Sequence, residues 1–254
     1  MDGWVRVGFE DVARVFRRQL RRTTGGAAVA VYHRGELVAD LWGGRQTEGQ
    51  LWQRDTLAMC FSTTKGVIST ALHVLADRGQ IDYDAPVAAY WPQFAQGGKA
   101  QITVRHVLTH SAGLHRMRTL VDAEVPAANG FFTARSLAKL YALLAHGGEV
   151  GGVRLLSPQT VRKIAVVHSR GPDLVLVLPM GWRLGYHSAF TTRGTVPGAF
   201  GHFGFGGSGG WADPRRDLAL AMVCNRGAGT PIGDLRMAEL GTAVVRAPGV
   251  SSPP

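Results

Sequence analysis

The sequence predicts an α+β fold in which one antiparallel sheet is assembled from both ends of the chain. Three observations support this prediction. Runs of small and β-forming residues occur near the N-terminus and again in the C-terminal third, helical stripes fill the middle, and 254 residues with 45% hydrophobic content can bury one large core. We therefore expect a single domain over residues 1–254, with helices flanking the sheet.

The first elements are predicted to be a helix and a hairpin. Apolar residues recur at helical spacing from Phe9 to Leu20, with arginines mostly off that stripe, which is typical of an amphipathic helix covering a core. Two strand-like runs follow, and Arg34-Gly35 between them is typical of a hairpin turn. The predicted elements are a helix over 9–22 and strands over 27–33 and 36–42.

The middle of the chain is predicted to be helical, and the C-terminal third returns to sheet. Ser62 and Ser157 precede helical stripes as capping residues, and glycines follow the ends of two of the stripes. The predicted helices are 62–79, 102–110, 133–145, a helix opening at 157, and 232–245; the predicted strands are 181–187, 201–211 around a glycine-dense turn, and 217–225; the tail 247–254 is predicted to be frayed.

Composition argues against nucleic-acid and membrane partners. The formal charge is +10, but the arginines are scattered singly rather than interleaved with aromatic residues. No window is apolar for long enough to span a membrane, and the N-terminus lacks a signal pattern. Cys60 and Cys224 are the only cysteines and have no metal-ligand spacing, so we expect a cytoplasmic protein with reduced thiols and no metal.

Ser62-Thr63-Thr64-Lys65 is the most informative motif. Its serine opens a predicted helix, and residues three apart lie on one helical face, so the lysine amine can reach the serine hydroxyl. Serine needs a base to act as a nucleophile, and lysine serves as one if burial and the helix N-terminus lower its pKa. The alternative interpretation is a helix cap followed by a surface lysine.

Two other patterns suggest different chemistry. The stretch GGSGG satisfies G-x-S-x-G, but no histidine follows Ser208, and the next residues predict a turn into a strand rather than a helix. His106, His110 and His115 have a spacing that zinc accepts, but no H-E-x-x-H is present. We therefore interpret Ser208 as structural and the histidine segment as a helix end.

Further stretches give the S-x-x-K motif a context. They are 36–44, 61–66 with the motif itself, 84–92, 102–114 with H-S-A-G-L, 134–141, and 201–208 with H-F-G. In order and spacing these stretches resemble the serine esterases related to class C β-lactamases and D-alanyl peptidases. The resemblance covers nearly the whole chain, and it implies a β-lactamase/transpeptidase-like fold.

The resemblance implies a role for each site residue. Ser62 would be acylated, Lys65 would be its proton partner, and backbone N–H groups at Ser62 and on the strand after His202 would form the oxyanion hole. His202 and Gly204 stand where lactamases carry K-T-G. A mostly neutral histidine offers no fixed cation to a β-lactam carboxylate, so this form favours neutral esters. The alternative is a core histidine beside a glycine turn.

One part of the family pattern is missing. Relatives carry a catalytic tyrosine in a helical lobe between the H-S-A-G-L segment and the A-R-x-L-A helix. Here the helical lobe is reduced to residues around 115–133, and they contain no tyrosine. Tyr186-His187 is similar to the missing motif but falls in a predicted strand, so we interpret Tyr186 as a core or surface residue.

These observations predict a serine hydrolase that cleaves small-molecule carboxylic esters through an acyl-Ser62 intermediate, with Lys65 as base and no cofactor. A second hypothesis is a binding or scaffold protein that keeps the fold but has lost activity with the tyrosine. A third is a β-lactamase or D-alanyl peptidase. It is disfavoured because the stretch His202-Phe203-Gly204, which we call the third motif, lacks the lysine of K-T-G. The reduced lobe also predicts self-association, because helices near 103–110 and 133–145 would lose cover for their apolar faces.

Overall fold

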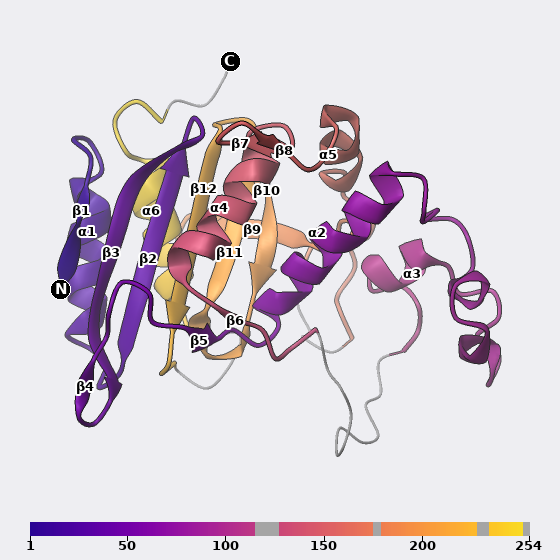
Figure 1. Cartoon of the computed structure of the whole chain (residues 1–254), viewed down its shortest axis with the longest axis horizontal. Helices are drawn as coiled ribbons and strands as arrows, with labels where there is room; N and C mark the ends of the chain where they lie inside the picture. The colour runs from indigo at the N-terminus through magenta and orange to yellow at the C-terminus, as the bar shows by residue number, and fades with distance from the viewer. Residues whose placement is uncertain (115–126, 175–178, 228–233, 251–254) are drawn as a thin grey trace.

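The computed structural model describes residues 1–114, 127–174, 179–227 and 234–250. Its centre is an antiparallel sheet (Figure 1). The N-terminal strand 26–33 pairs with the C-terminal strand 218–224, which confirms that both ends of the chain build the sheet. Across the sheet the strands are β1 (Asp2–Val5), β3 (Glu36–Thr47), β2 (Gly26–His33), β12 (Leu218–Cys224), β11 (Gly209–Asp213), β10 (Gly194–Phe203) and β9 (His187–Thr191), with β4 (Gln50–Leu51) paired to β3.

Helices cover both faces of this sheet. On one face α1 (Glu10–Leu20) packs against α6 (Arg236–Val245), and on the other α4 (Ala134–Ala145) lies over the central strands, with α2 (Thr63–Asp77) next to β10 (Figure 1). No helix in the described ranges is long and apolar enough to cross a membrane. The smaller elements are α3 (Val104–Leu108), α5 (Pro158–Ile164), β5 (Ala58–Met59), β6 (Phe131–Phe132), β7 (Glu149–Val150) and β8 (Val153–Arg154).

The central strand β12 shows why the sheet needs helices on both sides. All of its residues are buried. Leu218, Leu220 and Met222 belong to the core under α1 and α6, whereas the residues between them face the core under α4. Side chains alternate between the faces of a strand, so an unbroken apolar run such as this one requires cover on both faces.

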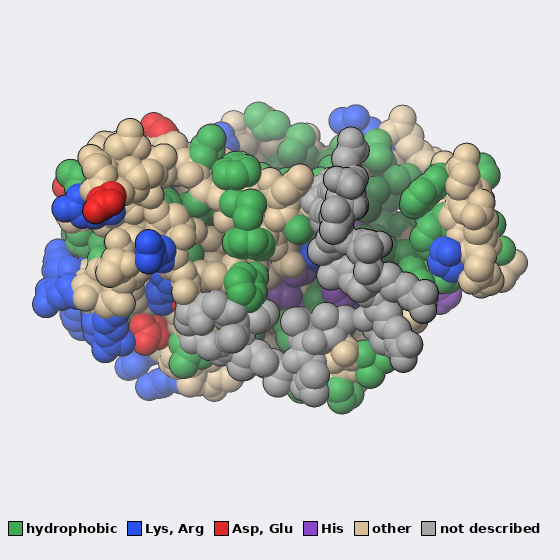
Figure 2. Space-filling view, turned by 90° about the horizontal axis from the view of Figure 1, so that it is seen from below, with side chains coloured by type: hydrophobic (Ala, Val, Ile, Leu, Met, Phe, Trp, Pro, Cys, Tyr) green, Lys and Arg blue, Asp and Glu red, His purple; other side chains and the backbone are tan. Residues whose placement is uncertain are grey.

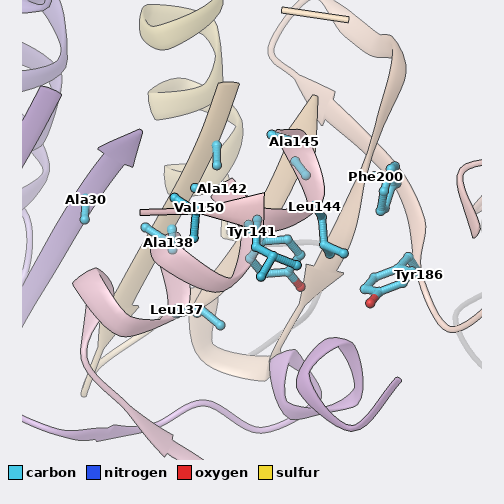
Figure 3. Packing of buried hydrophobic residues seen from close by; sticks show 14 of the residues in the cluster. Ala30, Leu137, Ala138, Tyr141, Ala142, Leu144, Ala145, Val150, Tyr186 and Phe200 are labelled. Carbon is cyan, nitrogen blue, oxygen red and sulfur yellow. The ribbon is translucent and has the colours of Figure 1, made fainter. Parts of the chain in front are cut away.

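Helix α4 is buried more deeply than the sequence predicts. We expected the loss of the lobe to leave an apolar face of 133–145 exposed, but eight of the twelve residues of α4 are buried. Small side chains at Ala138 and Ala142 let the helix lie close to the sheet, and Tyr141 and Leu144 fill the space beside them (Figure 3). The expectation was wrong for α4 because its apolar face meets the sheet rather than the lobe.

Side-chain caps fix the starts of three helices, and the predicted cap Ser157 is confirmed. The side-chain oxygens of Thr103, Thr133 and Ser157 each accept a hydrogen bond from a backbone N–H in the first turn of α3, α4 and α5. In α3 the side chain of His106 also accepts from the N–H of Thr103, which completes a capping box. The short helix is therefore fixed at its start by its own sequence.

Two predicted segments differ from the structure. Residues 181–186 form no strand beyond an isolated bridge between Trp182 and Ser169, because Gly181 and Gly185 adopt left-handed φ values of 59° and 78°. The strand runs instead from His187 to Thr191. The tail is not frayed from 247, because Ala247 and Val250 are buried against α1 and α6. Residues 251–254 lie outside the described part, as do 232 and 233 of the predicted last helix, which is described from 236.

Candidate active site

Ser62 and Lys65 lie together at the start of α2, as their spacing predicts. The Lys65 amine donates a hydrogen bond to the Ser62 hydroxyl with an Nζ–Oγ distance of 2.8 Å. Ser62 was expected to cap the helix, but it has helical dihedrals and its side chain accepts no cap hydrogen bond. Phe61 before it has a left-handed φ of 44°, a strained value for a residue with a side chain. This turn leaves the serine hydroxyl free to meet the lysine.

The surroundings of Lys65 favour its neutral form. Burial lowers the pKa of its amine, and the N-terminal end of a helix disfavours positive charge further. No carboxylate of the described residues forms a salt bridge with it. Its other partner is the carbonyl oxygen of Ala127, 3.2 Å from Nζ. Both ligands of this amine are therefore neutral oxygen atoms.

The end of β10 meets the start of α2 at Gly204. A Cβ placed on Gly204 would collide with the carbonyl oxygen of Cys60 and crowd the side chain of Thr63. Only glycine permits this approach of strand to helix. Thr63 also donates from Oγ1 to the carbonyl of Ser208 at 2.9 Å. The structure thus brings Gly204 of the third motif beside Ser62 of the first, although 142 residues separate them in the chain.

His202 is buried and uncharged. Its Nδ1 lies 3.0 Å from the carbonyl oxygen of Phe203 and donates to it, which leaves Nε2 as an acceptor. Burial, together with the nearby His187 and Lys65, holds the pKa of His202 well below its usual range. Nε2 is buried and has no hydrogen-bond partner among the described residues. The neutral histidine expected at the third motif is therefore present.

A second group of polar side chains lies near Lys65, and the sequence did not single it out as a unit. Nδ1 of His110 is 3.1 Å from Oδ2 of Asp173, the Trp182 indole N–H donates to the same oxygen at 3.0 Å, and the His110 and Trp182 rings stack with centroids 3.6 Å apart. Burial lowers the pKa of His110, and the hydrogen bond to Asp173 opposes this shift only in part. Asp173 was not predictable because 63 residues separate it from His110.

Two hollows border these residues. One, of about 350 Å³, lies beside the turn at Phe61 and contains the Phe61 and Phe205 rings, which pack edge to face 5.7 Å apart. The other, of about 590 Å³, contains His110 and Trp182. Seen from below, histidine side chains reach the middle of the surface and Lys and Arg side chains gather at the end with α1 (Figure 2). The first hollow is lined by Met59, Phe61, Phe205, Gly206, Cys224, Asn225 and Gly227.

The described residues of the two alternative sites have other partners. Ser208 is buried, and its hydroxyl oxygen accepts the N–H of Cys224 at 3.1 Å, as expected of a structural serine. His106 is used in the cap of α3 and His110 pairs with Asp173, so the two histidines have separate partners. His115 lies outside the described residues. Tyr186 is buried, and its hydroxyl lies 2.8 Å from that of Thr70, which confirms the interpretation as a core residue.

The tyrosine missing from the family pattern is not supplied from elsewhere. All five tyrosines lie in the described ranges, and no hydrogen bond joins a tyrosine hydroxyl to Ser62 or Lys65 there. The described residues 127–130, in the segment where the sequence predicts a reduced lobe, contribute backbone groups to this region. Besides the Ala127 carbonyl, the N–H of Gly130 donates to the Thr64 hydroxyl at 3.1 Å.

Comparison with known proteins agrees with this geometry. A family model described as Beta-lactamase matches residues 12–125 and 115–241. The chain belongs to the beta-lactamase family. Esterase/beta-lactamase LipL of Mycobacterium tuberculosis (strain ATCC 25618 / H37Rv) is 30% identical over 350 positions, which cover 86% of this chain and 81% of that protein. Esterase EstB of Burkholderia gladioli is 34% identical over 104 residues, 37% of this chain and 25% of that one.

Solved structures show the same beta-lactamase fold. The crystal structure of a family VIII carboxylesterase superposes with a TM-score of 0.88 at 26% identity, covering 96% of this chain and 99% of that one. A penicillin-binding protein homologue from Caulobacter crescentus superposes with a TM-score of 0.85 at 26% identity, covering 96% and 100%. The predicted family and fold class are confirmed, and these relatives support the prediction of a serine hydrolase enzyme.

The extents of these matches bear on the segment around residue 115. The match to LipL runs over more positions than this chain has residues, so that relative carries segments with no counterpart here. The two pieces of the family match overlap over residues 115–125, inside the segment where the sequence predicts the lobe. The reduced lobe stays a prediction, because residues 115–126 lie outside the described part of the chain.

Proposed function

We propose that the protein hydrolyses carboxylic esters through an acyl-enzyme intermediate on Ser62, with Lys65 as the base. The observation that carries this proposal is the 2.8 Å hydrogen bond between the Lys65 amine and the Ser62 hydroxyl at the start of a helix. A partly buried lysine with a lowered pKa can serve as a base at neutral pH, whereas a fully solvated one cannot. The similarity to proteins described as esterases and a carboxylesterase supports ester as the substrate class.

The proposed reaction follows from the positions of these groups. Neutral Lys65 removes the proton of Ser62 as its oxygen attacks the ester carbonyl, and a tetrahedral oxyanion forms. The N–H groups of Ser62 and Phe205 donate to no backbone acceptor among the described residues, and they flank the contact between α2 and β10. In the proposal they bind the oxyanion. Collapse expels the alcohol, which takes the proton held by Lys65, and water then releases the acid.

The substrate is proposed to be a neutral ester with an apolar group next to its carbonyl. His202 is neutral, so it presents no fixed positive charge to a carboxylate of the substrate. The hollow beside Phe61 contains the Phe61, Phe205 and Met59 side chains, which suit an acyl or alkyl group. The unpartnered Nε2 of His202 supports a functional position, since a buried acceptor without a hydrogen bond costs folding free energy.

Activity is proposed to be weak on esters with poor leaving groups. The alcohol must be protonated as it leaves, and the second partner of Lys65 is the Ala127 carbonyl, which accepts a hydrogen bond but cannot deliver a proton. No tyrosine hydroxyl shares that task in the described part of the chain. The scaffold and lactamase hypotheses therefore become outcomes of the same tests. Location in the cytoplasm and self-association stay predictions; the two cysteines are buried and free.

The test is covalent labelling with a fluorophosphonate, followed by measurement of the intact mass. We expect one adduct on the wild-type protein and none on Ser62→Ala. Ser208→Ala is the matched control, because it also removes one hydroxyl near the third motif and should keep the adduct. A wild-type protein that is folded but unlabelled would favour the scaffold hypothesis. An adduct that survives in Ser62→Ala would overturn the role of the motif.

A further inference from the structure

The strand that carries the third motif loses its neighbour before it reaches the site. On β10, Gly201 pairs with His187, the first residue of β9, so Phe203 lies beyond the end of that strand. On the β9 side of the strand, no backbone carbonyl of β9 lies opposite Phe203 to accept its N–H. Instead it donates to Nε2 of the His187 side chain at 3.0 Å. The His187 imidazole thus replaces the backbone carbonyl that a longer β9 would offer to Phe203.

The tautomer of His187 is fixed for this task. Its Nδ1 lies 2.9 Å from the carbonyl oxygen of Ser188 and donates to it, so Nε2 carries the lone pair that faces Phe203. The ring is 1% exposed, and burial lowers the pKa of His187 to about 4, which keeps it neutral at ordinary pH. Its ring also packs edge to face against Phe203 with centroids 4.9 Å apart.

Tyr141 holds the same strand from the layer of helices. From α4 it reaches toward the sheet, and its hydroxyl accepts the N–H of His202 at 3.1 Å (Figure 3). Two glycines make room for it. A Cβ on Gly66 would collide with the hydroxyl, and one on Gly210 would collide with the ring. The hydroxyl therefore sits between β10 and the residue that follows Lys65 in α2.

We infer that His187 and Tyr141 are positioning residues that hold the third-motif strand, 202–204, at its distance from Ser62. Beyond Phe203 the chain continues with Gly204, whose N–H donates to the carbonyl of Ser208 at 2.8 Å, and then with Phe205. The N–H groups of residues 202–204 each donate a hydrogen bond, and the N–H of Phe205, the proposed oxyanion donor, comes directly after them. Because an oxyanion hole works through preorganised geometry, loosening the strand should lower kcat more than it raises KM. This inference rests on the proposed function.

The test compares variants in pairs. His187→Leu removes the acceptor, whereas His187→Gln offers an amide oxygen near the position of Nε2. With p-nitrophenyl acetate we expect kcat of His187→Leu to fall by about tenfold or more with KM nearly unchanged, and that of His187→Gln to stay within about threefold of wild type. Tyr141→Phe should also lower kcat, while Tyr186→Phe, which removes another buried hydroxyl from the same core, should not.

Amide hydrogen exchange gives a readout that does not depend on activity. Peptides covering residues 200–206 should exchange faster in His187→Leu and Tyr141→Phe than in Tyr186→Phe. If His187→Leu does not fold, the two tyrosine variants decide. Equal kcat and equal exchange for Tyr141→Phe and Tyr186→Phe would overturn the inference. These results are distinct from a failure of the proposed function, which would show as an adduct that persists in Ser62→Ala.

Discussion

Two walls meet at Ser62, and they are built from different groups. The wall of α2 and β10 is made by close packing, with Gly204 against Cys60 and side-chain acceptors holding the end of the strand. On the side of the reduced lobe, the described residues 127–130 offer backbone groups alone to the site: a carbonyl to Lys65 and an N–H to Thr64. A carbonyl oxygen can accept a hydrogen bond, but it carries no proton that it could donate to a leaving group.

The two walls therefore supply separable parts of the proposed reaction. On the proposed mechanism, the first wall supplies the nucleophile, its base and the oxyanion donors, which suffice for acylation by a reactive ester. The second wall would assist the transfer of the proton from Lys65 to the leaving group. A chain with the first wall intact and the second reduced should therefore acylate readily and discriminate strongly by leaving group. The predictions below separate these contributions.

The largest effect is expected between substrate classes. With neutral His202 at the third motif, kcat/KM for p-nitrophenyl acetate should exceed that for nitrocefin by about a thousandfold or more, roughly 4 kcal/mol of transition-state binding. Steady-state kinetics with both substrates on one preparation measures the ratio. Similar values for the two would contradict the role given to the uncharged histidine and would favour the lactamase hypothesis.

Removing the base should have the next largest effect. Lys65→Met keeps the length of the side chain but loses the amine, and kcat/KM should fall by about a hundred- to ten-thousandfold. Because the base must be unprotonated, wild-type activity should rise with pH up to the lowered pKa of Lys65. Lys163→Met, at an exposed lysine of α5, is the control and should behave as wild type. A flat pH profile would argue against an amine as the base.

The reduced wall should appear as dependence on the leaving group. Family members use the tyrosine for proton transfer, a contribution of about a hundred- to ten-thousandfold, so esters that need an assisted leaving group should lose about that much relative to activated ones. A plot of log kcat/KM against the pKa of the leaving alcohol should be steep, and Tyr186→Phe should leave it unchanged. Ordinary enzymatic rates on alkyl esters would reveal another proton donor.

The smallest effect concerns stability rather than rate. Burial lowers the pKa of His73 and of His187 to about 4 from 6.5. Between these pH values the unfolded chain therefore binds more protons than the folded one. The free energy of unfolding is highest above pH 6.5 and falls as the pH drops toward 4. Each histidine should cost about 2 kcal/mol at pH 5 relative to pH 7. Urea unfolding at both pH values measures this loss, and an unchanged free energy of unfolding would contradict it.

Local patterns were enough to predict much of the molecule. The S-x-x-K spacing predicted the contact between Ser62 and Lys65, and the strand-like runs at both ends predicted the sheet. The groups that support the site were not predictable, because they meet only in the folded chain. Asp173 reaches His110, and His187 reaches Phe203, through tertiary contacts that no short motif encodes. Gly181 and Gly185 broke a predicted strand by adopting left-handed backbone, a choice that composition does not reveal.

The most direct measurement is to trap the acyl-enzyme. The protein is mixed with p-nitrophenyl acetate, quenched in acid within the first turnovers, and its intact mass and peptides are analysed. We expect one acetyl group on the peptide 55–65, placed on Ser62 by fragmentation and absent from Ser62→Ala, because acylation uses the intact wall of the site. Turnover without any acyl intermediate, or an acetyl group on another residue in the active wild-type protein, would contradict the proposed mechanism.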